Sequence, residues 1–168
     1  MNDTRSCVSA VATNCVSDAA PYVLSDANLA SSVFVDANYA STFASSLLTG
    51  QGVSAEDSAA IAECLVQADL RGVQTHGMSR LPIYVKRVER GLVNARPNMK
   101  LNKPMAACAS LDGDNGFGFL VGIRAMREAA EMAETCGVGV VSAYNSNHFG
   151  MAASYLLQAI TAGYFAFV

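Results

Sequence analysis

Apolar residues recur at helical intervals in the chain from residue 33 onward. The spacing predicts a first helix over 33–48, which nearby glycines end. Ser54 is expected to cap a second helix, and Gly72 to end it, with Ile61 and Leu65 on its buried side. The early part of the sequence is therefore expected to be helical.

A third helix is predicted over Ser79–Arg90. Ser79 is a suitable N-cap, and Pro82 falls in the first turn, where its missing N–H does no harm. Gly91 suits the C-terminal stop. An apolar stripe at helical spacing marks the buried side of this helix: Leu81, Val85 and Val88.

The pattern changes after residue 94. A connection over 94–104, with Pro and Asn, leads into a short apolar strand at about 106–111. The turn-forming run DGDNGFG over 112–118 then precedes a long helix that Gly137 ends. The polar side chains of this helix fall on one face, namely Arg124, Arg127, Glu128, Glu131 and Glu134.

The C-terminal part continues with a buried strand over 138–142, a loop over 145–150 and a helix to Ala162. A last strand is expected over 164–168. This alternation predicts the α/β class, with an N-terminal helical segment followed by an incomplete sheet of neighbouring mixed or parallel strands. Because the chain ends inside the apolar run YFAFV, the sequence is interpreted as cut short.

Three regions are therefore expected. Residues 1–31, rich in Ser, Ala, Asp and Asn, are interpreted as a flexible N-terminal extension. Residues 32–104 form the helical segment, which carries a THGxxR motif, and residues 105–168 form a truncated α/β domain. The chain of 168 residues is long enough to bury roughly 70% of its unfolded surface.

Charge is unevenly distributed along the chain. The composition, 52% hydrophobic and 15% charged, is that of a packed globular protein. Most of the 11 Lys and Arg residues lie within 71–103, where Glu89 is the single acid. Such a basic stretch attracts a small carboxylate or a phosphorylated cofactor, although a solvated basic face is the alternative. The acidic pI of about 5.2 argues against nucleic acid, and no apolar run reaches the length of about 18 residues that a membrane span needs.

The five cysteines are scattered, odd in number and without a C-x-x-C pair. Reduced thiols in a cytoplasmic protein are the simplest interpretation. Cys64 and Cys136 fall within helical patterns and are expected to be small buried hydrophobic residues. No zinc site is predicted.

The richest candidate chemistry lies in DLRGVQTHGMSRLPIY, residues 69–84. Thr75, His76, Arg80 and Tyr84 surround a glycine turn there. Histidine has its ordinary pKa near neutrality, at about 6.5, and arginine offers a permanently charged fork for a carboxylate or phosphate. A capped helix with solvated charges is the alternative interpretation of this stretch.

A second candidate loop, NSNHFG, contains the other histidine, His148. It follows a predicted strand and precedes a helix, which is where open α/β sheets bind ligands. A Rossmann fingerprint around Gly116 and Gly118 fails, because Gly122 comes one residue too late and Asp112 and Asp114 would meet the pyrophosphate. These glycines are predicted to allow close packing of helix and strand, and no nucleophile elbow for a hydrolytic triad is present.

The stretches ADLRGVQTHGMSRLPIYVKRVERGLVN, LDGDNGFG and GVGVVSAYNSNHFG resemble the malate/L-lactate dehydrogenase family. That family also contains ureidoglycolate dehydrogenase and the piperideine-2-carboxylate reductases. The resemblance implies a non-Rossmann nucleotide-binding fold, NAD or NADP as cofactor, a small 2-hydroxy acid or cyclic imine as substrate, and a homodimer. Family members are roughly twice as long as this chain.

The resemblance also implies roles for individual residues. His148 is expected to be the base, His76 a second proton-transfer group, and Arg80 the clamp for the substrate carboxylate, with support from Tyr84. Thr75 stands where the family usually has Ser. The residues implied near the cofactor are His76, Asn147, His148, Phe149 and Gly150. The alternative is a catalytically inactive fragment or pseudogene product that acts only through interaction with other subunits.

Overall fold

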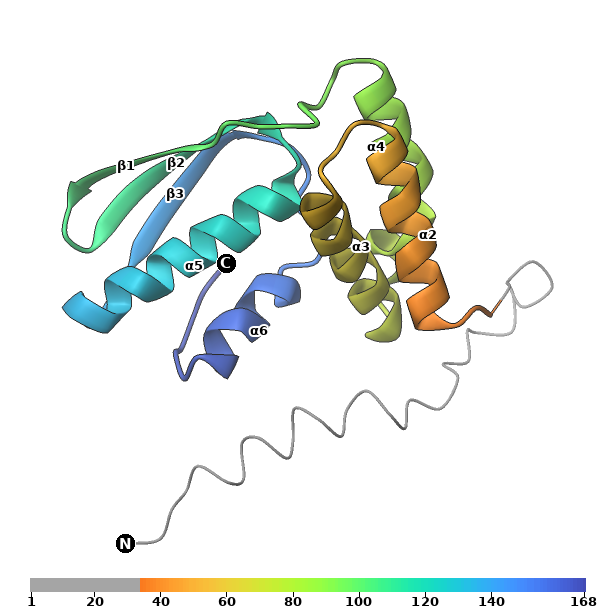
Figure 1. The fold of residues 1–168 in the computed structure, drawn as a ribbon. Helices are drawn as coiled ribbons and strands as arrows, with labels where there is room; N and C mark the ends of the chain where they lie inside the picture. The colour runs from red at the N-terminus through yellow and green to blue at the C-terminus, as the bar shows by residue number, and fades with distance from the viewer. Residues whose placement is uncertain (1–33) are drawn as a thin grey trace, which may run out of the picture. The chain divides into compact units, whose positions relative to one another are not determined.

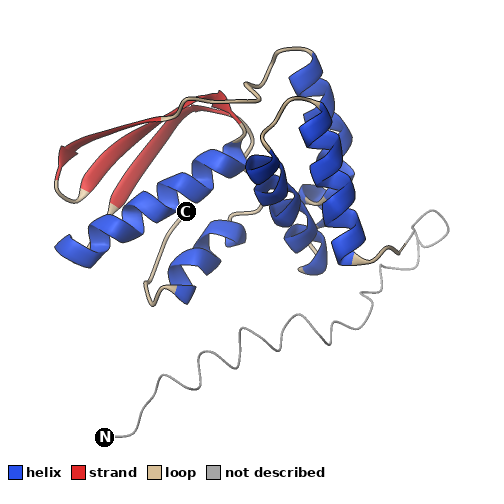
Figure 2. Ribbon diagram, in the orientation of Figure 1, coloured by secondary structure: helices blue, strands red, loops and turns tan. Residues whose placement is uncertain are grey.

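The computed structural model describes residues 34–168 (Figure 1), of which 36–168 form one compact unit. The flexible extension expected over 1–31 lies outside the described residues. The architecture is mixed α/β, as predicted, with helices and a three-stranded sheet (Figure 2). The division between residues 104 and 105 stays a prediction.

Two helices begin at capped positions. Helix α2 spans Ala37–Gly50, and the carboxylate of Asp36 accepts hydrogen bonds from the N–H groups of Asn38 and Tyr39 at its start. Helix α3 spans Ala55–Leu70 and begins at the predicted cap Ser54, whose hydroxyl accepts from the N–H of Asp57. These side chains satisfy backbone donors that the first turn of a helix leaves unpaired.

The prediction that Ser79 caps the third helix is wrong. Two 3₁₀ turns, η2 at Gln74–His76 and η3 at Met78–Arg80, precede helix α4, which spans Leu81–Glu89. The Ser79 hydroxyl lies within η3 and donates to the carbonyl of Gln74 at 2.8 Å, so it closes the turn instead of capping α4.

The sheet has the order β1-β2-β3. Strand β1 (Lys100–Met105) pairs antiparallel with β2 (Cys108–Gly116), and β2 pairs parallel with β3 (Val140–Ser146). The mixed strand directions agree with the prediction. The interpretation of 94–104 as a plain connection is wrong, because its second half forms β1. This strand carries polar residues and is largely exposed, so it has no apolar alternation to reveal it.

Strand β2 also extends beyond the predicted 106–111, into the run that was expected to be a turn. Asp114 and Asn115 have φ of 48° and 54°, and the parallel register with β3 shifts between Asp112 and Gly116. The turn-forming residues therefore make an irregularity inside the strand, since Asp and Asn tolerate the left-handed conformation. This irregularity determines where the end of β2 meets the start of the next helix.

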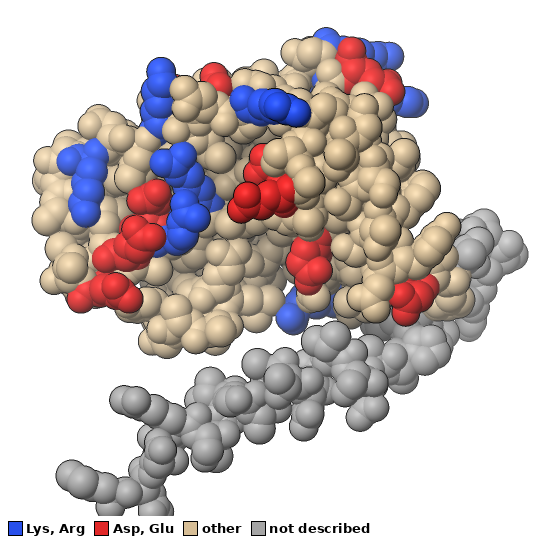
Figure 3. Space-filling model, viewed as in Figure 1, with Lys and Arg blue, Asp and Glu red and all other residues tan. Residues whose placement is uncertain are grey.

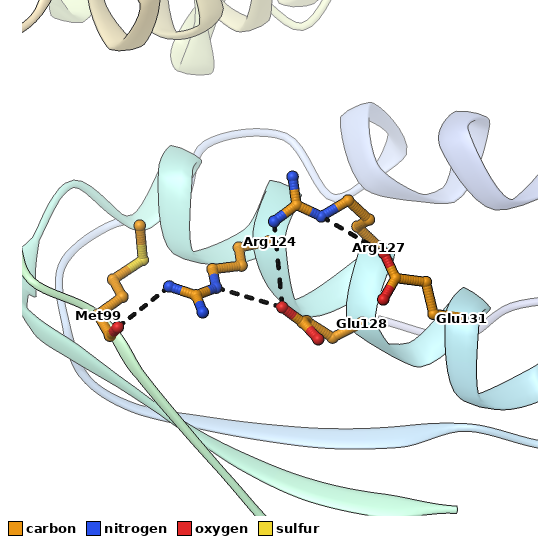
Figure 4. Close-up of polar contacts among 5 residues, drawn as sticks. All are labelled: Met99, Arg124, Arg127, Glu128 and Glu131. Atoms are coloured by element: carbon orange, nitrogen blue, oxygen red, sulfur yellow. Dashed lines mark hydrogen bonds and ion pairs between the residues drawn. The ribbon is translucent and has the colours of Figure 1, made fainter.

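Helix α5 (Gly118–Cys136) packs against β2 and β3 on one side of the sheet, and helix α6 (Ala153–Thr161) lies beside α5 (Figure 1). The predicted polar face of α5 is confirmed. It carries a ladder of ion pairs from Arg124 to Glu128 and from Arg127 to Glu128 and Glu131 (Figure 4). Acidic and basic side chains are accordingly interspersed on the face in Figure 3.

The hydrophobic core joins the helices to the start of α5. Leu65, Leu81 and Tyr84 belong to the same buried cluster as Phe117 and Phe119. Because this cluster connects α3 and α4 with the β2–α5 junction, it holds together the two regions that contain the candidate site residues.

Three further expectations are wrong. Strand β3 begins at residue 140, forms one edge of the three-stranded sheet and is largely exposed. Residues 164–168 form no strand, and Phe165 and Phe167 are 86% and 85% exposed. Cys136 is exposed at the end of α5, whereas Cys64 is buried as predicted. Within 34–168, no helix has the length and apolar character to cross a membrane.

Candidate functional site

The turn between α3 and α4 is held by Asp69. Its carboxylate accepts a hydrogen bond from the N–H of Met78 at 2.8 Å and lies directly against Gly77, where a Cβ would collide with it. Partial burial raises the pKa of Asp69, and the bond from Met78 opposes that shift. A side chain at residue 77 would therefore have to displace the Asp69 carboxylate from its bond to Met78, a steric constraint that no local pattern in the chain indicates.

Thr75, His76 and Arg80 are connected to one another within this turn. The Thr75 hydroxyl lies 2.9 Å from Nδ1 of His76, and Nε of Arg80 donates to the carbonyl of Thr75 at 2.7 Å. The hydrogen bond to the Thr75 carbonyl orients the Arg80 side chain and uses only Nε, so neither terminal nitrogen takes part in it. A guanidinium oriented in this way can offer its fork to an anion.

Tyr84 connects the hydrophobic core to the site. Its side chain is buried, and its ring meets the edges of Phe117 and Phe119 at centroid distances of 6.3 and 5.3 Å. Its hydroxyl lies 2.9 Å from Nδ1 of His148, a residue 64 positions away in the chain. The packed ring leaves the phenol little freedom, so the hydroxyl position is set by the core.

His148 lies in the loop between β3 and α6, where three rings come together. Its ring stacks on His76 with a centroid distance of 5.4 Å and an interplanar angle of 23°, and on Tyr84 at 6.2 Å and 28°. The loop backbone packs directly on Gly118, since a Cβ there would lie 2.5 Å from the carbonyl oxygen of His148. The prediction that this glycine allows close packing at the start of the helix is confirmed, but the segment packed on it is the loop after β3 and not a strand.

Asn147 fixes the same loop through hydrogen bonds of its side-chain amide. Its Oδ1 accepts from Nη2 of Arg87 at 2.7 Å, and its Nδ2 lies 3.0 Å from the carbonyls of Asn115 and Gly116 and from Oδ1 of Asn115. Both of its N–H donors and one lone pair of its Oδ1 are directed at the protein itself. Its side chain therefore positions the loop and has no N–H left for a cofactor.

Sequence reasoning missed Arg87 as a site residue. It lies three residues after Tyr84 and seven after Arg80, so helical spacing places it on their face of α4, a signal that could have identified it. Its contact with Asn147 joins residues 60 positions apart, which the sequence does not reveal.

The hydrogen bonds of His148 determine which ring nitrogen carries the proton. The N–H of Gly150, which can only donate, lies 3.3 Å from Nδ1. Nδ1 is therefore the acceptor, the proton of the neutral ring is on Nε2, and the Tyr84 hydroxyl donates to Nδ1. Burial lowers the pKa of His148 below its ordinary value, and His76 and Arg80 lower it further. Burial raises the pKa of Tyr84, which Arg80 and Arg87 partly oppose, so the phenol stays neutral near neutral pH.

A pocket of about 250 Å³ opens at this point, lined by Arg80, Ile83, Tyr84, Arg87 and His148. The structure thus brings together three of the predicted site residues at the pocket wall, with His76 stacked behind His148. Phe149 does not line the pocket, because its ring stacks on Tyr155 of α6 at 5.5 Å. Gly150 contributes its N–H to His148 and has a φ of +74°, which glycine adopts without strain.

The donor set of the pocket wall suits a small acid beside the nicotinamide end of a cofactor, since it combines guanidinium, phenol and imidazole groups with the apolar side chain of Ile83. The described residues have this capacity at one end of such a cofactor only. They do not form a Rossmann pyrophosphate site, because the carbonyls of Asn147 and His148 lie against Gly118 at the start of α5. This agrees with the failed fingerprint in the sequence.

Comparison with known proteins identifies the family. Residues 35–168 match the family model described as malate/L-lactate dehydrogenase. The chain belongs to this family. It is 40% identical over 137 residues to a malate dehydrogenase of Pyrococcus abyssi, and 43% identical over 104 residues to an L-sulfolactate dehydrogenase of Methanocaldococcus jannaschii. These alignments cover 77% and 62% of this chain.

The fold agrees with that assignment. The malate dehydrogenase of Pyrococcus horikoshii superposes with a TM-score of 0.79 at 39% identity, covering 84% of this chain and 40% of that protein. The curated relatives are covered over 38% and 30% of their own length. The chain thus spans well under half the length of these relatives. A further relative, from Escherichia coli, is named ureidoglycolate dehydrogenase (NAD(+)) and is 34% identical over 113 residues, which cover 67% of this chain.

Proposed function

We propose that the protein to which this chain belongs is an NAD(P)-dependent oxidoreductase of small 2-hydroxy acids, with its proton-transfer site at Tyr84 and His148. The observation that carries the proposal is the hydrogen bond between these two side chains in a pocket that also contains Arg80. Cyclic imines are a second substrate class consistent with the resemblance. Membership of the dehydrogenase family supports the reaction type.

Each pocket residue has a separate role in the oxidation of the alcohol. Arg80 binds the substrate carboxylate and orients the hydroxyl toward the Tyr84 oxygen. The substrate proton passes to Tyr84 while the phenolic proton moves to Nδ1 of His148, which becomes imidazolium. The lowered pKa of His148 keeps its ring neutral and able to accept that proton at neutral pH. His76 supports the His148 ring by stacking on it.

A nicotinamide cofactor bound at this site would supply the hydride-acceptor chemistry, while Tyr84 and His148 take up the hydroxyl proton. NAD or NADP as cofactor and the homodimer are proposals that rest on the family resemblance, whereas the cytoplasmic location is a proposal that rests on the scattered cysteines. Nucleic acid and membrane partners are not proposed.

Site-directed variants of the full-length protein test the proton-transfer site. His148→Ala and Tyr84→Phe should each lower kcat/KM for a 2-hydroxy acid by about 10²-fold or more, since general-base catalysis is lost. Arg80→Lys should mainly raise KM, because an ammonium cannot form the bidentate fork. Arg90→Lys, on the exposed end of the same helical segment, is the matched control and should keep wild-type values.

Wild-type turnover by His148→Ala would remove this residue from the mechanism. Absence of turnover in the wild-type protein, with a panel of 2-hydroxy acids and both cofactors, would favour the alternative of an inactive family fragment. The partial coverage of the relatives is the observation behind that alternative.

A further inference from the structure

Asp69 lies at a position that its own helix does not favour. It occupies the last turn of α3, where a negative charge opposes the helix dipole, and no basic residue lies in that turn. Its side chain is half-buried, and in the part of the chain that the structure describes no ion pair includes it. Burial raises the pKa of Asp69, so the charged form costs free energy in the folded protein. A side chain that opposes its own helix in this way is expected to serve a contact elsewhere.

That contact is with the turn between the two 3₁₀ segments. The N-cap of η3 is Gly77, which has no side chain to accept the N–H of Met78. Oδ2 of Asp69 accepts this N–H instead, at 2.8 Å and from nine positions earlier in the chain. Because η3 leads directly into α4, the carboxylate also lies at the start of that helical segment, where a negative charge is favoured.

Arg80 ends η3 and is bonded to the same turn at two points. Its backbone N–H donates to the carbonyl of Gly77 at 2.9 Å, and its Nε donates to the carbonyl of Thr75 at 2.7 Å. Gly77 lies against Asp69, since the three heavy atoms nearest to the point that a Cβ would occupy all belong to the Asp69 carboxylate. The direction of the Arg80 guanidinium therefore depends on a carboxylate that does not line the pocket.

Tyr84 and His148 depend less on this turn. The Tyr84 ring is packed against Phe117 and Phe119, and His148 lies on a separate loop that Asn147 connects to α4 and to the end of β2. A disturbance of the turn should thus change the binding of the acid more than the transfer of its proton.

We propose that Asp69 is a positioning residue of the substrate-carboxylate site. By holding Gly77 and Met78, it sets the direction of the Arg80 guanidinium and with it the affinity for the acid. This inference rests on the proposed function, in which Arg80 binds the substrate carboxylate, and it adds to the site a residue of α3 that lies outside the pocket.

Steady-state kinetics of the full-length protein test the inference, with L-malate and L-lactate as probes. Asp69→Ala should raise KM for the acid by about 10-fold or more, as expected for a lost hydrogen bond to a charged group, and should change kcat by less than about threefold. Asp69→Asn should recover most of the loss, because its amide oxygen can still accept from Met78. Glu63→Gln is the matched control and should keep the wild-type KM, since it also replaces an acid of α3 by an amide but at an exposed position bonded only within that helix.

Two double variants distinguish positioning from a general structural effect. Gly77→Ala should raise KM as Asp69→Ala does, because its methyl group displaces the carboxylate, whereas the φ of −95° suits any residue. This variant keeps the carboxylate, so it also carries the test if Asp69→Ala does not fold. The combination of Asp69→Ala with Gly77→Ala should be no worse than the larger single effect, since the methyl group then has the space of the missing carboxylate.

Asp69→Ala should also leave KM unchanged in an Arg80→Ala background, because the guanidinium through which it acts is absent. Additive effects on log KM in either double variant would overturn the inference. A loss of kcat as large as the rise in KM in Asp69→Ala would overturn it as well.

Equilibrium binding separates this inference from the proposed function. Isothermal titration of the full-length protein with each acid should show weaker binding by Asp69→Ala and unchanged binding by Glu63→Gln. Binding without turnover by the wild-type protein, weakened in Asp69→Ala, would refute the proposed function and retain the role of Asp69. Turnover with unchanged KM and affinity in Asp69→Ala would retain the proposed function and refute the role of Asp69. No binding of either acid by the wild-type protein would refute both.

Discussion

Gly118 is the position where we expect one added methyl group to damage the site most directly. In Gly118→Ala the new Cβ would lie 2.5 Å from the carbonyl oxygen of His148 and 2.6 Å from its carbonyl carbon. Ordinary contact begins at 3.4 Å, so the loop must move away from α5 by about 1 Å. Overpacking of this kind costs about 1–3 kcal/mol of unfolding free energy. A displacement of about 1 Å at a reacting group lowers kcat/KM by about 10²-fold.

Urea denaturation and steady-state kinetics of the full-length protein measure the two effects. Gly50→Ala, at the end of α2, is the matched control, because no heavy atom lies within 4 Å of the point that an added Cβ would occupy. It should leave kcat/KM unchanged and leave stability unchanged or raised by up to about 1 kcal/mol. If Gly118→Ala matched Gly50→Ala in both measurements, the close packing of the loop on α5 would not position His148.

The ionisation of two side chains leads to further predictions. The pKa of His148 is lower in the folded protein than in the unfolded chain, so the unfolded chain binds a proton on this ring first as the pH falls. The contribution of the neutral ring to the free energy of unfolding is therefore complete above about pH 6.5 and is lost as the pH falls through the folded-state pKa. The acid limb of kcat/KM for oxidation should therefore lie below about pH 6.5 and disappear in His148→Ala, and a limb above that pH would contradict the assignment. Burial raises the pKa of Cys64 to about 11, whereas Cys136 is exposed, so alkylation of the native protein followed by peptide mass mapping should label Cys136 and spare Cys64 until unfolding. Equal labelling rates would show that the α3 thiol is accessible.

Local chemistry allowed much of the fold to be predicted. Helix α3 was located from its cap Ser54 and its buried residues, and the end of α5 from Gly137, which has a φ of +75°. These signals depend only on residues close in the chain, namely backbone donors that need a cap and apolar side chains that repeat every turn. Arg80, Tyr84 and His148 were identified as candidate site residues from their side-chain chemistry and their place beside a helix start or after a strand, and the family resemblance implied their roles.

The sheet could not be predicted in the same way. Strand β1 has no apolar alternation, and it exists because Lys100–Met105 finds a hydrogen-bonding partner in β2. The turn-forming residues Asp114 and Asn115 are kept within β2 because β3 pairs on both sides of them. Strand pairing is a long-range interaction, so the local preference of a segment does not decide it.

What the sequence determined by itself was the set of reactive groups and the helices that carry them. The tertiary structure determined which of these groups lie within hydrogen-bond distance of one another. It brought Tyr84 to His148 across 64 positions, and it connected Arg87 to Asn147 across 60. These contacts depend on a shared core, in which Phe117 and Phe119 hold Tyr84 against the start of α5. Only packing between distant elements can set the distances and the pKa shifts on which proton transfer depends.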